Sequence, residues 1–121
     1  MISVAARLVE MHPQTLRKYE REGLIAPSRT SGNLRLYSDS DIERLRQVKY
    51  LVEQRGLNLA GVQLALELTH QVQDLRGRIV AATDGRKQSP VVAELDAVLE
   101  SLGFVDEQKL RDTQRRDQTR T

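Results

Sequence analysis

Cysteine and tryptophan are absent from this chain of 121 residues, and phenylalanine occurs only once. Without cysteine, the chain forms no disulfides and no thiolate metal sites. With so few aromatic rings, it has little to line a deep apolar pocket for a small molecule. No apolar run approaches the roughly 20 residues of a transmembrane helix, and Met1 leads directly into a helical pattern without a signal peptide. We therefore expect neither a membrane protein nor a secreted one.

Groups that commonly carry catalysis are scarce as well. The two histidines, His12 and His70, lie far apart in the sequence, and no glycine-rich phosphate-binding loop occurs. Aspartate and glutamate are mixed with lysine and arginine, as on an ordinary solvated helix surface. We therefore expect no enzyme activity, no bound metal and no cofactor.

The net charge is only +2, but it is unevenly distributed. Residues 1–60 contain ten Lys and Arg against seven Asp and Glu, a net charge of +3. Residues 61–121 contain nine against ten, a net charge of −1. The first part is therefore the one expected to meet a phosphate-bearing partner. Two copies side by side would double its positive charge.

The first 24 residues carry the signals of two short helices joined by a tight turn. In the first helix, Val4, Ala5 and Leu8 share one face at helical spacing. Pro13 suits the first position of the second helix, because its missing N–H would have no partner there. Gly23 can adopt the positive φ that ends a helix. The pair predicts a helix-turn-helix, with a plain helical hairpin as the alternative.

The turn departs from the usual helix-turn-helix pattern at two positions. Glu10 stands where glycine is common, so a positive φ there would strain its backbone. Either the turn has another shape or the chain accepts a modest cost in free energy. His12 stands where a serine cap is common. Its imidazole can accept a hydrogen bond from the helix, or it can reach DNA.

Residues 27–37 predict a β-hairpin with a Gly-Asn turn between two strand-like runs. Leu34 and Leu36 alternate with Arg35 and Tyr37, so apolar and functional side chains are expected on opposite faces. A basic hairpin that follows a recognition helix is a wing. Its arginines can reach phosphate or the minor groove, and its tyrosine can hydrogen-bond a phosphate.

A third helix is expected from about residue 39 to about residue 54. Ser38 and Asp41 have the spacing of a capping box at its start, and Gly56 closes it. One face carries apolar residues at helical spacing. These are Ile42, Leu45, Val48, Leu51 and Val52.

These motifs, in this order, resemble the MerR family of bacterial transcription regulators. The likeness covers roughly Ile2 to Leu68, and residues 12–17 and 56–62 are most similar to the family's repressors of heat-shock chaperone genes. It implies a mainly α fold, namely a MerR-like winged helix-turn-helix. It also implies that the protein acts in the bacterial cytoplasm. Because this chain has no cysteine, the metal-sensing branch of the family is disfavoured. The resemblance rests on Arg17-Lys18-Tyr19-Glu20, Gly23-Leu24-Ile25, Pro27, Arg35, Tyr37 and Asp41-Ile42-Glu43-Arg44-Leu45.

The resemblance places the second helix and the wing on DNA. Gln14 and Thr15 are the candidates for base contacts, because Gln can pair with adenine and the Thr methyl can touch thymine. Thr15 can alternatively be a helix-start residue without a base contact. Tyr19 can lie partly in the core and partly at the surface. Glu20 and Glu22 are expected to pair with basic neighbours or to face solvent. The candidate DNA-binding residues are His12, Gln14, Thr15, Arg17, Lys18, Tyr19, Arg21, Arg29, Arg35 and Tyr37.

The second half of the chain indicates dimerisation. Apolar residues recur at steps of four, three, four and three, which is a short heptad seam. The alternative is an amphipathic helix that folds back on its own domain. The family resemblance implies an antiparallel pair of helices between two subunits. The seam consists of Leu68, Val72, Leu75, Ile79 and Ala82.

Four parts of the chain are therefore expected. Residues 1–68 form the DNA-binding domain and residues 69–83 the dimerisation helix. Residues 84–105 form a loop and a helix that is capped by Ser89 and ended by Gly103. This helix can pack on the partner subunit or present a surface to another protein. Residues 106–121 are polar and charged, and we expect them to be disordered.

The function expected from these features is that of a homodimeric repressor that binds an inverted repeat in double-stranded DNA. Resemblance to the heat-shock repressors further implies the chaperone DnaK as a corepressor. Two alternatives remain open. One is a MerR-type activator that responds to a small molecule, and the other is an excisionase-like protein that bends DNA for recombination.

Overall fold

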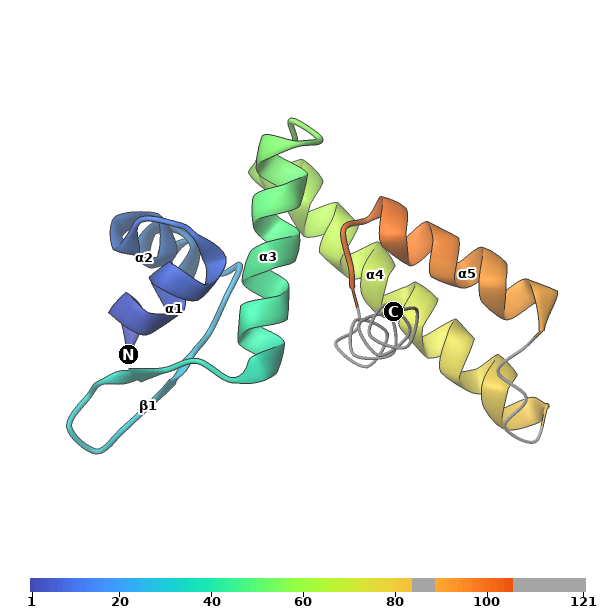
Figure 1. Ribbon diagram of the computed structural model, residues 1–121, viewed down its shortest axis with the longest axis horizontal. Helices are drawn as coiled ribbons and strands as arrows, with labels where there is room; N and C mark the ends of the chain where they lie inside the picture. The colour runs from blue at the N-terminus through green and yellow to red at the C-terminus, as the bar shows by residue number, and fades with distance from the viewer. Residues whose placement is uncertain (84–88, 106–121) are drawn as a thin grey trace, which may run out of the picture. The chain divides into compact units, whose positions relative to one another are not determined.

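The computed structural model describes residues 1–83 and 89–105 (Figure 1). The predicted loop at residues 84–88 and the predicted tail at 106–121 lie outside these ranges. The predicted fold class is confirmed, because the described chain is mainly helical with one small β-hairpin. The elements are α1 (Ile2–Val9), α2 (Pro13–Arg21), β1 (Ser28–Arg29), β2 (Arg35–Leu36), α3 (Asp39–Glu53), α4 (Leu59–Ala82) and α5 (Pro90–Ser101).

The chain divides into two compact units, and the division falls within α3. The first unit is Met1–Lys49 and contains the helix-turn-helix and the wing. The second unit begins at Tyr50 and contains α4 and α5. No helix in the described ranges combines the length and the apolar character needed to cross a membrane.

Helix α1 is buried through Ala5, Ala6 and Val9. The prediction that Val4, Ala5 and Leu8 form the packed face is wrong, since Val4 and Leu8 are 53% and 54% exposed. Alanine presents the smallest side chain after glycine, so two adjacent alanines allow α2 to pack closely against this side of α1. The larger Val4 and Leu8 are left on the outer side.

The turn between α1 and α2 holds Glu10 at a φ of 54°, in the left-handed region. The Met11 N–H then donates to the Ala6 carbonyl at 2.9 Å and closes the end of α1. The chain therefore accepts a glutamate in a conformation that favours glycine. His12 is the N-cap of α2, because its Nδ1 accepts a hydrogen bond from the Gln14 N–H at 3.1 Å.

The end of α2 is closed by Gly23, whose φ is 78°. The Leu24 N–H donates to the Tyr19 carbonyl at 2.9 Å, as in a Schellman motif. The Leu24 carbonyl in turn accepts from the Arg44 guanidinium of α3. The predicted stop of the recognition helix is confirmed, and a cation from a later helix holds the chain that leaves it.

Two further α3 cations support the end of α1. Lys49 Nζ donates to the carbonyls of Val9 and Glu10 at 3.2 and 3.1 Å. Arg46 Nη2 donates to the Leu8 carbonyl at 3.4 Å. The last carbonyls of a helix have no partner within it and carry partial negative charge, so cations stabilise them. These two side chains add to the positive count of the first unit but serve its fold.

Helix α3 begins with the predicted capping box. The Asp41 N–H donates to Ser38 Oγ at 3.1 Å, and the Ser38 N–H donates back to Asp41 Oδ2 at 2.9 Å. Gly56, with a φ of 65°, follows the helix. Four of the five predicted apolar residues are buried, and Val52 is half-buried. The buried ones are Ile42, Leu45, Val48 and Leu51.

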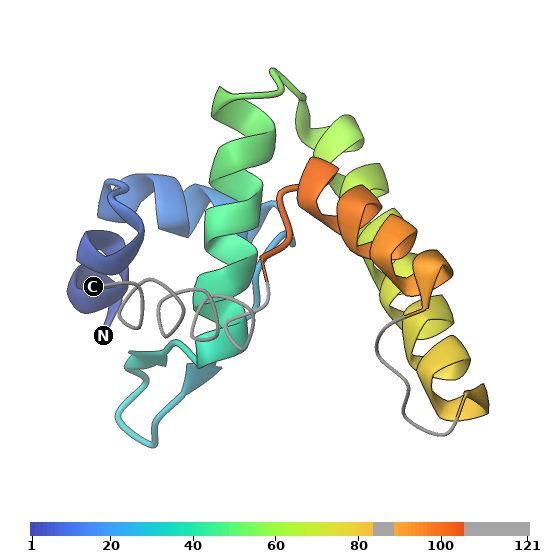
Figure 2. The same ribbon diagram turned by 45° about the vertical axis from the view of Figure 1, so that its right-hand side comes forward.

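In the second unit, α4 and α5 lie side by side (Figures 1 and 2). Asn58 caps α4 by accepting from the Gly61 N–H at 2.9 Å. The Arg76 Nε and Asp96 Oδ1 atoms join the two helices at 2.6 Å. Gly103 ends α5 at a φ of 78°, where a Cβ atom would collide with a tyrosine ring. Ser89 caps α5 as predicted.

Helix α4 has a buried side, and the predicted seam lies mostly outside it. The buried side consists of Val62, Ala65, Leu66 and Thr69. In the seam, Leu68 and Leu75 are each 41% exposed, and Ala82 is exposed as well. Val72 and Ile79 are half-buried. The side that folds back within its own chain is therefore a different side from the one that carries Leu68 and Leu75.

Candidate nucleic-acid interface

Helix α2 presents one polar, basic side. Gln14, Lys18 and Arg21 are exposed at steps of four and three residues, so they follow one another along the same face. Arg17 is half-exposed beside them. Leu16 is fully buried on the opposite face. The helix thus anchors through its apolar side and turns hydrogen-bond donors and cations outward.

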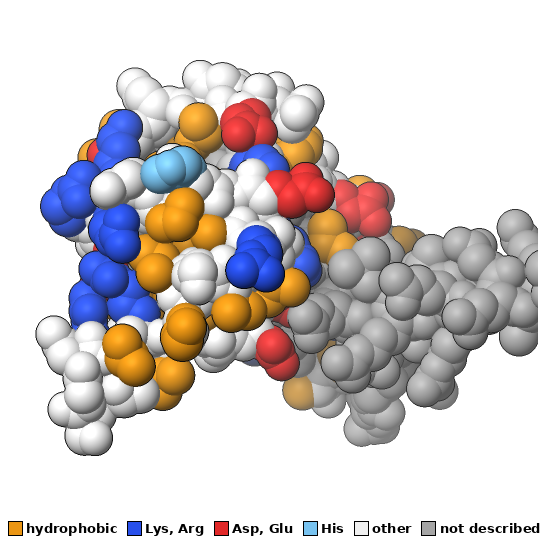
Figure 3. All heavy atoms as spheres, turned by 60° about the vertical axis from the view of Figure 1, so that its left-hand side comes forward, with side chains coloured by type: hydrophobic (Ala, Val, Ile, Leu, Met, Phe, Trp, Pro, Cys, Tyr) orange, Lys and Arg blue, Asp and Glu red, His pale blue; other side chains and the backbone are white. Residues whose placement is uncertain are grey.

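Figure 3 shows Lys and Arg side chains gathered along one edge of a face of the first unit. Two of the DNA-binding candidates from the sequence are less exposed to solvent than the side chains of this edge. Tyr19 is buried, with 8% of its surface exposed. Thr15 is half-buried at the flank of α2. His12 is exposed, but its Nδ1 is already used to cap the helix.

The wing is an antiparallel pair of two-residue strands. Ser28 pairs with Leu36 and Arg29 with Arg35. In the turn, Asn33 has a φ of 64°, and its N–H donates to the Thr30 carbonyl at 2.9 Å. Asparagine tolerates this left-handed conformation better than most residues. The hairpin that the sequence predicts is therefore confirmed, with its positive φ at the asparagine.

The two faces of the wing separate side chains by type. Leu34 and Leu36 are exposed, whereas Arg35 and Tyr37 are half-buried. The alternation expected from the sequence is present. It is the functional face, and not the apolar one, that turns toward the rest of the first unit. The reason is a carboxylate on α2 that attracts it.

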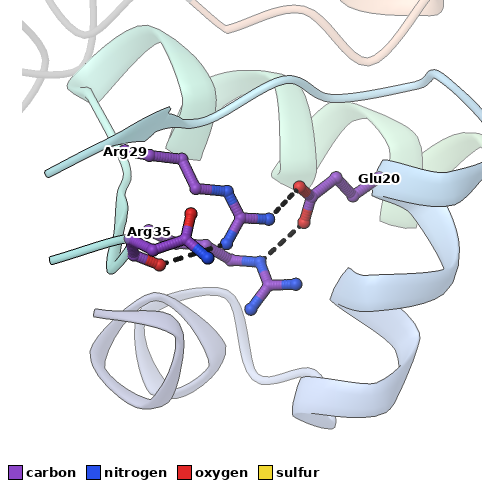
Figure 4. A network of polar contacts seen from close by, with 4 residues as sticks. Glu20, Arg29 and Arg35 are labelled. Atoms are coloured by element: carbon purple, nitrogen blue, oxygen red, sulfur yellow. Dashed lines mark hydrogen bonds and ion pairs between the residues drawn. The ribbon is translucent and has the colours of Figure 1, made fainter. Parts of the chain in front are cut away.

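Glu20 of α2 holds both arginines of the wing (Figure 4). Glu20 Oε1 accepts from Arg29 Nη2 at 2.6 Å, and Glu20 Oε2 accepts from Arg35 Nε at 2.6 Å. Arg29 Nη1 also donates to the Asn33 carbonyl at 3.3 Å. The expectation that Glu20 pairs with basic neighbours is confirmed. That its partners are the two wing arginines could not be read from the sequence.

This network shifts proton affinities in the directions expected for ion pairs. The hydrogen bond from Arg35 holds the pKa of the Glu20 carboxyl below its usual range, with Arg29 acting in the same direction against the effect of burial. The same bond raises the pKa of the Arg35 guanidinium. Glu20 is therefore ionised at neutral pH, and the three groups carry a net charge of +1.

The Tyr37 hydroxyl has an unusual environment. Its oxygen is buried and makes no hydrogen bond to any described part of the chain. Burial raises the pKa of the phenol, while the charges of Arg35, Glu20 and Arg29 also act on it. The ring therefore lies near the Glu20 network. In this conformation the hydroxyl oxygen is buried, so a contact with phosphate would require the side chain to turn outward.

The acidic residue directly after α2 forms a weaker ion pair. Glu22 Oε1 lies 4.0 Å from Lys18 Nζ, and the Lys18 side chain is 62% exposed. Such an exposed pair contributes about 0–1 kcal/mol to stability. The expectation that Glu22 pairs with a basic neighbour is confirmed, but the pair leaves Lys18 available to an outside anion.

The elements together define a winged helix-turn-helix, a class whose second helix and wing are used to bind DNA. A model of the MerR HTH family of regulatory proteins matches residues 1–69. The chain therefore belongs to the MerR family. Residues 1–69 are the helix-turn-helix part that this family of regulatory proteins shares.

Comparison with known proteins gives three informative relatives. A Streptomyces coelicolor protein with the provisional name heat shock protein HspR is 52% identical over 88 residues, which are 70% of this chain and 58% of that protein. The transcriptional regulator GlnR of Bacillus cereus is 38% identical over 65 residues, 54% of this chain and 50% of GlnR. YfmP of Bacillus subtilis is 32% identical over 88% of this chain and 77% of YfmP. The chain thus spans about half the length of the first two.

Proposed function

We propose that the chain is a homodimeric repressor of heat-shock chaperone genes that binds an inverted-repeat operator. The observation that carries this proposal is the 52% identity to the HspR relative, on a chain with an exposed basic recognition helix and a wing. The dimer would occupy the promoter in the bacterial cytoplasm and block or misalign RNA polymerase.

The exposed side of α2 is proposed to lie in the major groove. Gln14 stands near the N-terminal end of the helix, where recognition helices contact bases, and it can pair with adenine. Arg17, Lys18 and Arg21 follow on the same side and suit phosphate contacts. Contributions from the flank and the wing complete the proposed surface. These come from His12, Thr15, Tyr19, Arg29, Arg35 and Tyr37.

The proposed division of labour follows the helices. Residues 1–68 bind DNA, residues 69–83 pair two subunits, and residues 84–105 supply α5. Helix α4 spans Leu59–Ala82, so the end of the DNA-binding part and all but the last residue of the dimerisation segment share one continuous helix. Two subunits paired through this helix would be related by a two-fold axis, and an inverted repeat in DNA mirrors that symmetry.

DnaK is proposed as the corepressor, on the resemblance to the heat-shock repressors. The regulatory logic would be a competition. Unfolded protein would draw DnaK away during stress, and the regulator alone would then release the operator. Linkage requires that DnaK bind the DNA-bound regulator more tightly than the free one, by the same factor by which it strengthens operator binding.

Fluorescence anisotropy tests the proposal. A labelled duplex from the promoter of the host's own dnaK operon and a scrambled duplex of the same length are titrated with the full chain at one near-physiological salt concentration. Each titration is repeated with excess DnaK. We expect tighter binding to the promoter duplex by at least about 10³-fold, and a further gain when DnaK is present.

The outcomes separate the alternatives. Promoter binding that is unaffected by DnaK would remove the chaperone from the proposal and leave a MerR-type regulator with another effector. Equal, weak binding to both duplexes would contradict the proposal that the chain recognises an operator in this promoter. It would favour an architectural role.

A further inference from the structure

The Glu20 carboxylate connects the two elements that meet DNA, since it belongs to α2 and binds both arginines of the wing. We propose that Glu20 is a specificity-determining residue that restrains Arg29 and Arg35, so that they do not pair freely with phosphates of any sequence. This inference rests on the proposed binding of α2 and the wing to operator DNA. Glu20 acts through the arginines and is a positioning residue.

The first step of the argument is competition for the same donors. A carboxylate and a phosphate both accept from guanidinium N–H groups in the same charge-assisted geometry. Both oxygens of Glu20 are occupied, each at 2.6 Å. A phosphate that takes Arg29 Nη2 or Arg35 Nε must therefore displace Glu20, and one that binds the terminal nitrogens of Arg35 must accept the position in which Glu20 holds that side chain. Non-specific DNA, which gains no base contacts from α2, has the least binding energy to offset this displacement.

The second step concerns how firmly the arginines are held. The side chains of Glu20, Arg29 and Arg35 are 22%, 35% and 23% exposed, so the network is neither sealed in the core nor fully solvated. Partial burial reduces the screening by salt that weakens exposed ion pairs. The restraint is therefore stronger than that of an open surface pair, yet the groups stay within reach of an approaching phosphate.

The third step concerns orientation. Arg35 is tethered through Nε, and Figure 4 shows its terminal nitrogens directed away from Glu20. Arg29 is held at both ends of its guanidinium, by Glu20 through Nη2 and by the Asn33 carbonyl through Nη1. The turn of the wing is thereby linked to α2 through Arg29. The network fixes where the wing's positive charge lies relative to the recognition helix, and a fixed geometry fits few backbone shapes.

Glu20→Gln tests the proposal, with Glu22→Gln as its matched control. Each variant removes one negative charge, Glu20→Gln within the last turn of α2 and Glu22→Gln at the C-cap that directly follows it. In the described part of the chain, the Glu22 side chain pairs with Lys18, at 4.0 Å, and not with the wing arginines. Each variant is titrated with the promoter duplex and the scrambled duplex over a series of salt concentrations. Circular dichroism and a thermal melt establish that each variant is folded.

For Glu20→Gln we expect tighter binding to scrambled DNA and a ratio of promoter to scrambled affinity that falls roughly fivefold, the upper end of what one exposed ion pair contributes. The salt dependence on scrambled DNA should steepen by about 0.9 for each arginine released. Glu22→Gln should raise both affinities alike and keep the ratio. A third variant, Glu20→Asp, keeps the charge but shortens the reach to the wing, and its ratio should also fall.

The two proposals fail in different ways. If the wild-type chain does not distinguish the promoter from the scrambled duplex, the proposed function is wrong. If the wild type does distinguish them and both Glu20 variants keep the ratio of Glu22→Gln, the restraint by Glu20 is wrong. A Glu20→Gln variant that fails to fold leaves Glu20→Asp to decide between the same two outcomes.

Discussion

At the scale of single residues, we expect that removing the Tyr37 hydroxyl stabilises the protein measurably. It is buried without a hydrogen bond to the described chain, and a buried polar group without a partner costs about 1–3 kcal/mol. Tyr37→Phe removes the hydroxyl and keeps the ring. We expect the free energy of unfolding to rise by about 1 kcal/mol, measured by urea denaturation.

The same change at Tyr50, in the second unit, gives the baseline for removing a phenolic hydroxyl from this protein. A fall in stability for Tyr37→Phe relative to this baseline would show that the hydroxyl has a partner, such as an ordered water. Operator binding adds a second readout. If the hydroxyl turns outward to a phosphate in the complex, Tyr37→Phe weakens binding while it stabilises the free protein.

At the scale of elements, the turn between α1 and α2 stores a small conformational cost at Glu10. Its φ of 54° is one that glycine adopts without strain. Glu10→Gly should therefore raise the free energy of unfolding by up to about 1 kcal/mol. The carbonyl of residue 10, which accepts from Lys49, is kept by the change.

Glu10→Ala is the control for this turn. It removes the same charge but keeps the Cβ atom that makes a positive φ unfavourable. The difference between the two variants in urea denaturation isolates the backbone contribution. Equal stability of Glu10→Gly and Glu10→Ala would mean that the turn carries no such cost.

Elements also mark the limit of what the sequence predicts. Helix starts and stops follow from residues a few positions apart, so Ser38 with Asp41, Ser89 and Gly23 were predictable from local rules. The buried face of α1 was not, because Val4 and Leu8 are more apolar than Ala5 and only the close packing of α2 favours the alanines. The same holds for Glu20, whose wing partners are nine and fifteen residues away.

Charge shows this limit most clearly. Counting Lys and Arg predicted that the first part of the chain is the one that meets DNA. The count could not show that Arg44, Arg46 and Lys49 bind backbone carbonyls, or that Arg29 and Arg35 share one carboxylate. Partners that distant in the sequence are set by tertiary packing, for which a single sequence carries no periodic signal.

At the scale of the whole molecule, the question is what covers the seam of α4. Leu68 and Leu75 are each 41% exposed and stand seven residues apart, while α5 packs against α4 elsewhere. A second copy of α4 in an antiparallel pair would cover them and would bring two DNA-binding units together. We expect the double variant Leu68→Glu, Leu75→Glu to be monomeric by sedimentation equilibrium and to keep its helical circular dichroism signal.

Gln63→Glu with His70→Glu is the matched control, because it adds two acidic groups at exposed positions of α4 outside the seam. This control should remain a dimer. Loss of the dimer should also weaken binding to the inverted repeat far more than binding to a single half-site, since only the dimer engages both halves at once. A seam variant that stays dimeric and binds the repeat as tightly as the control would assign dimerisation to another surface. The two recognition helices would then have to be spaced by contacts other than this helix pair.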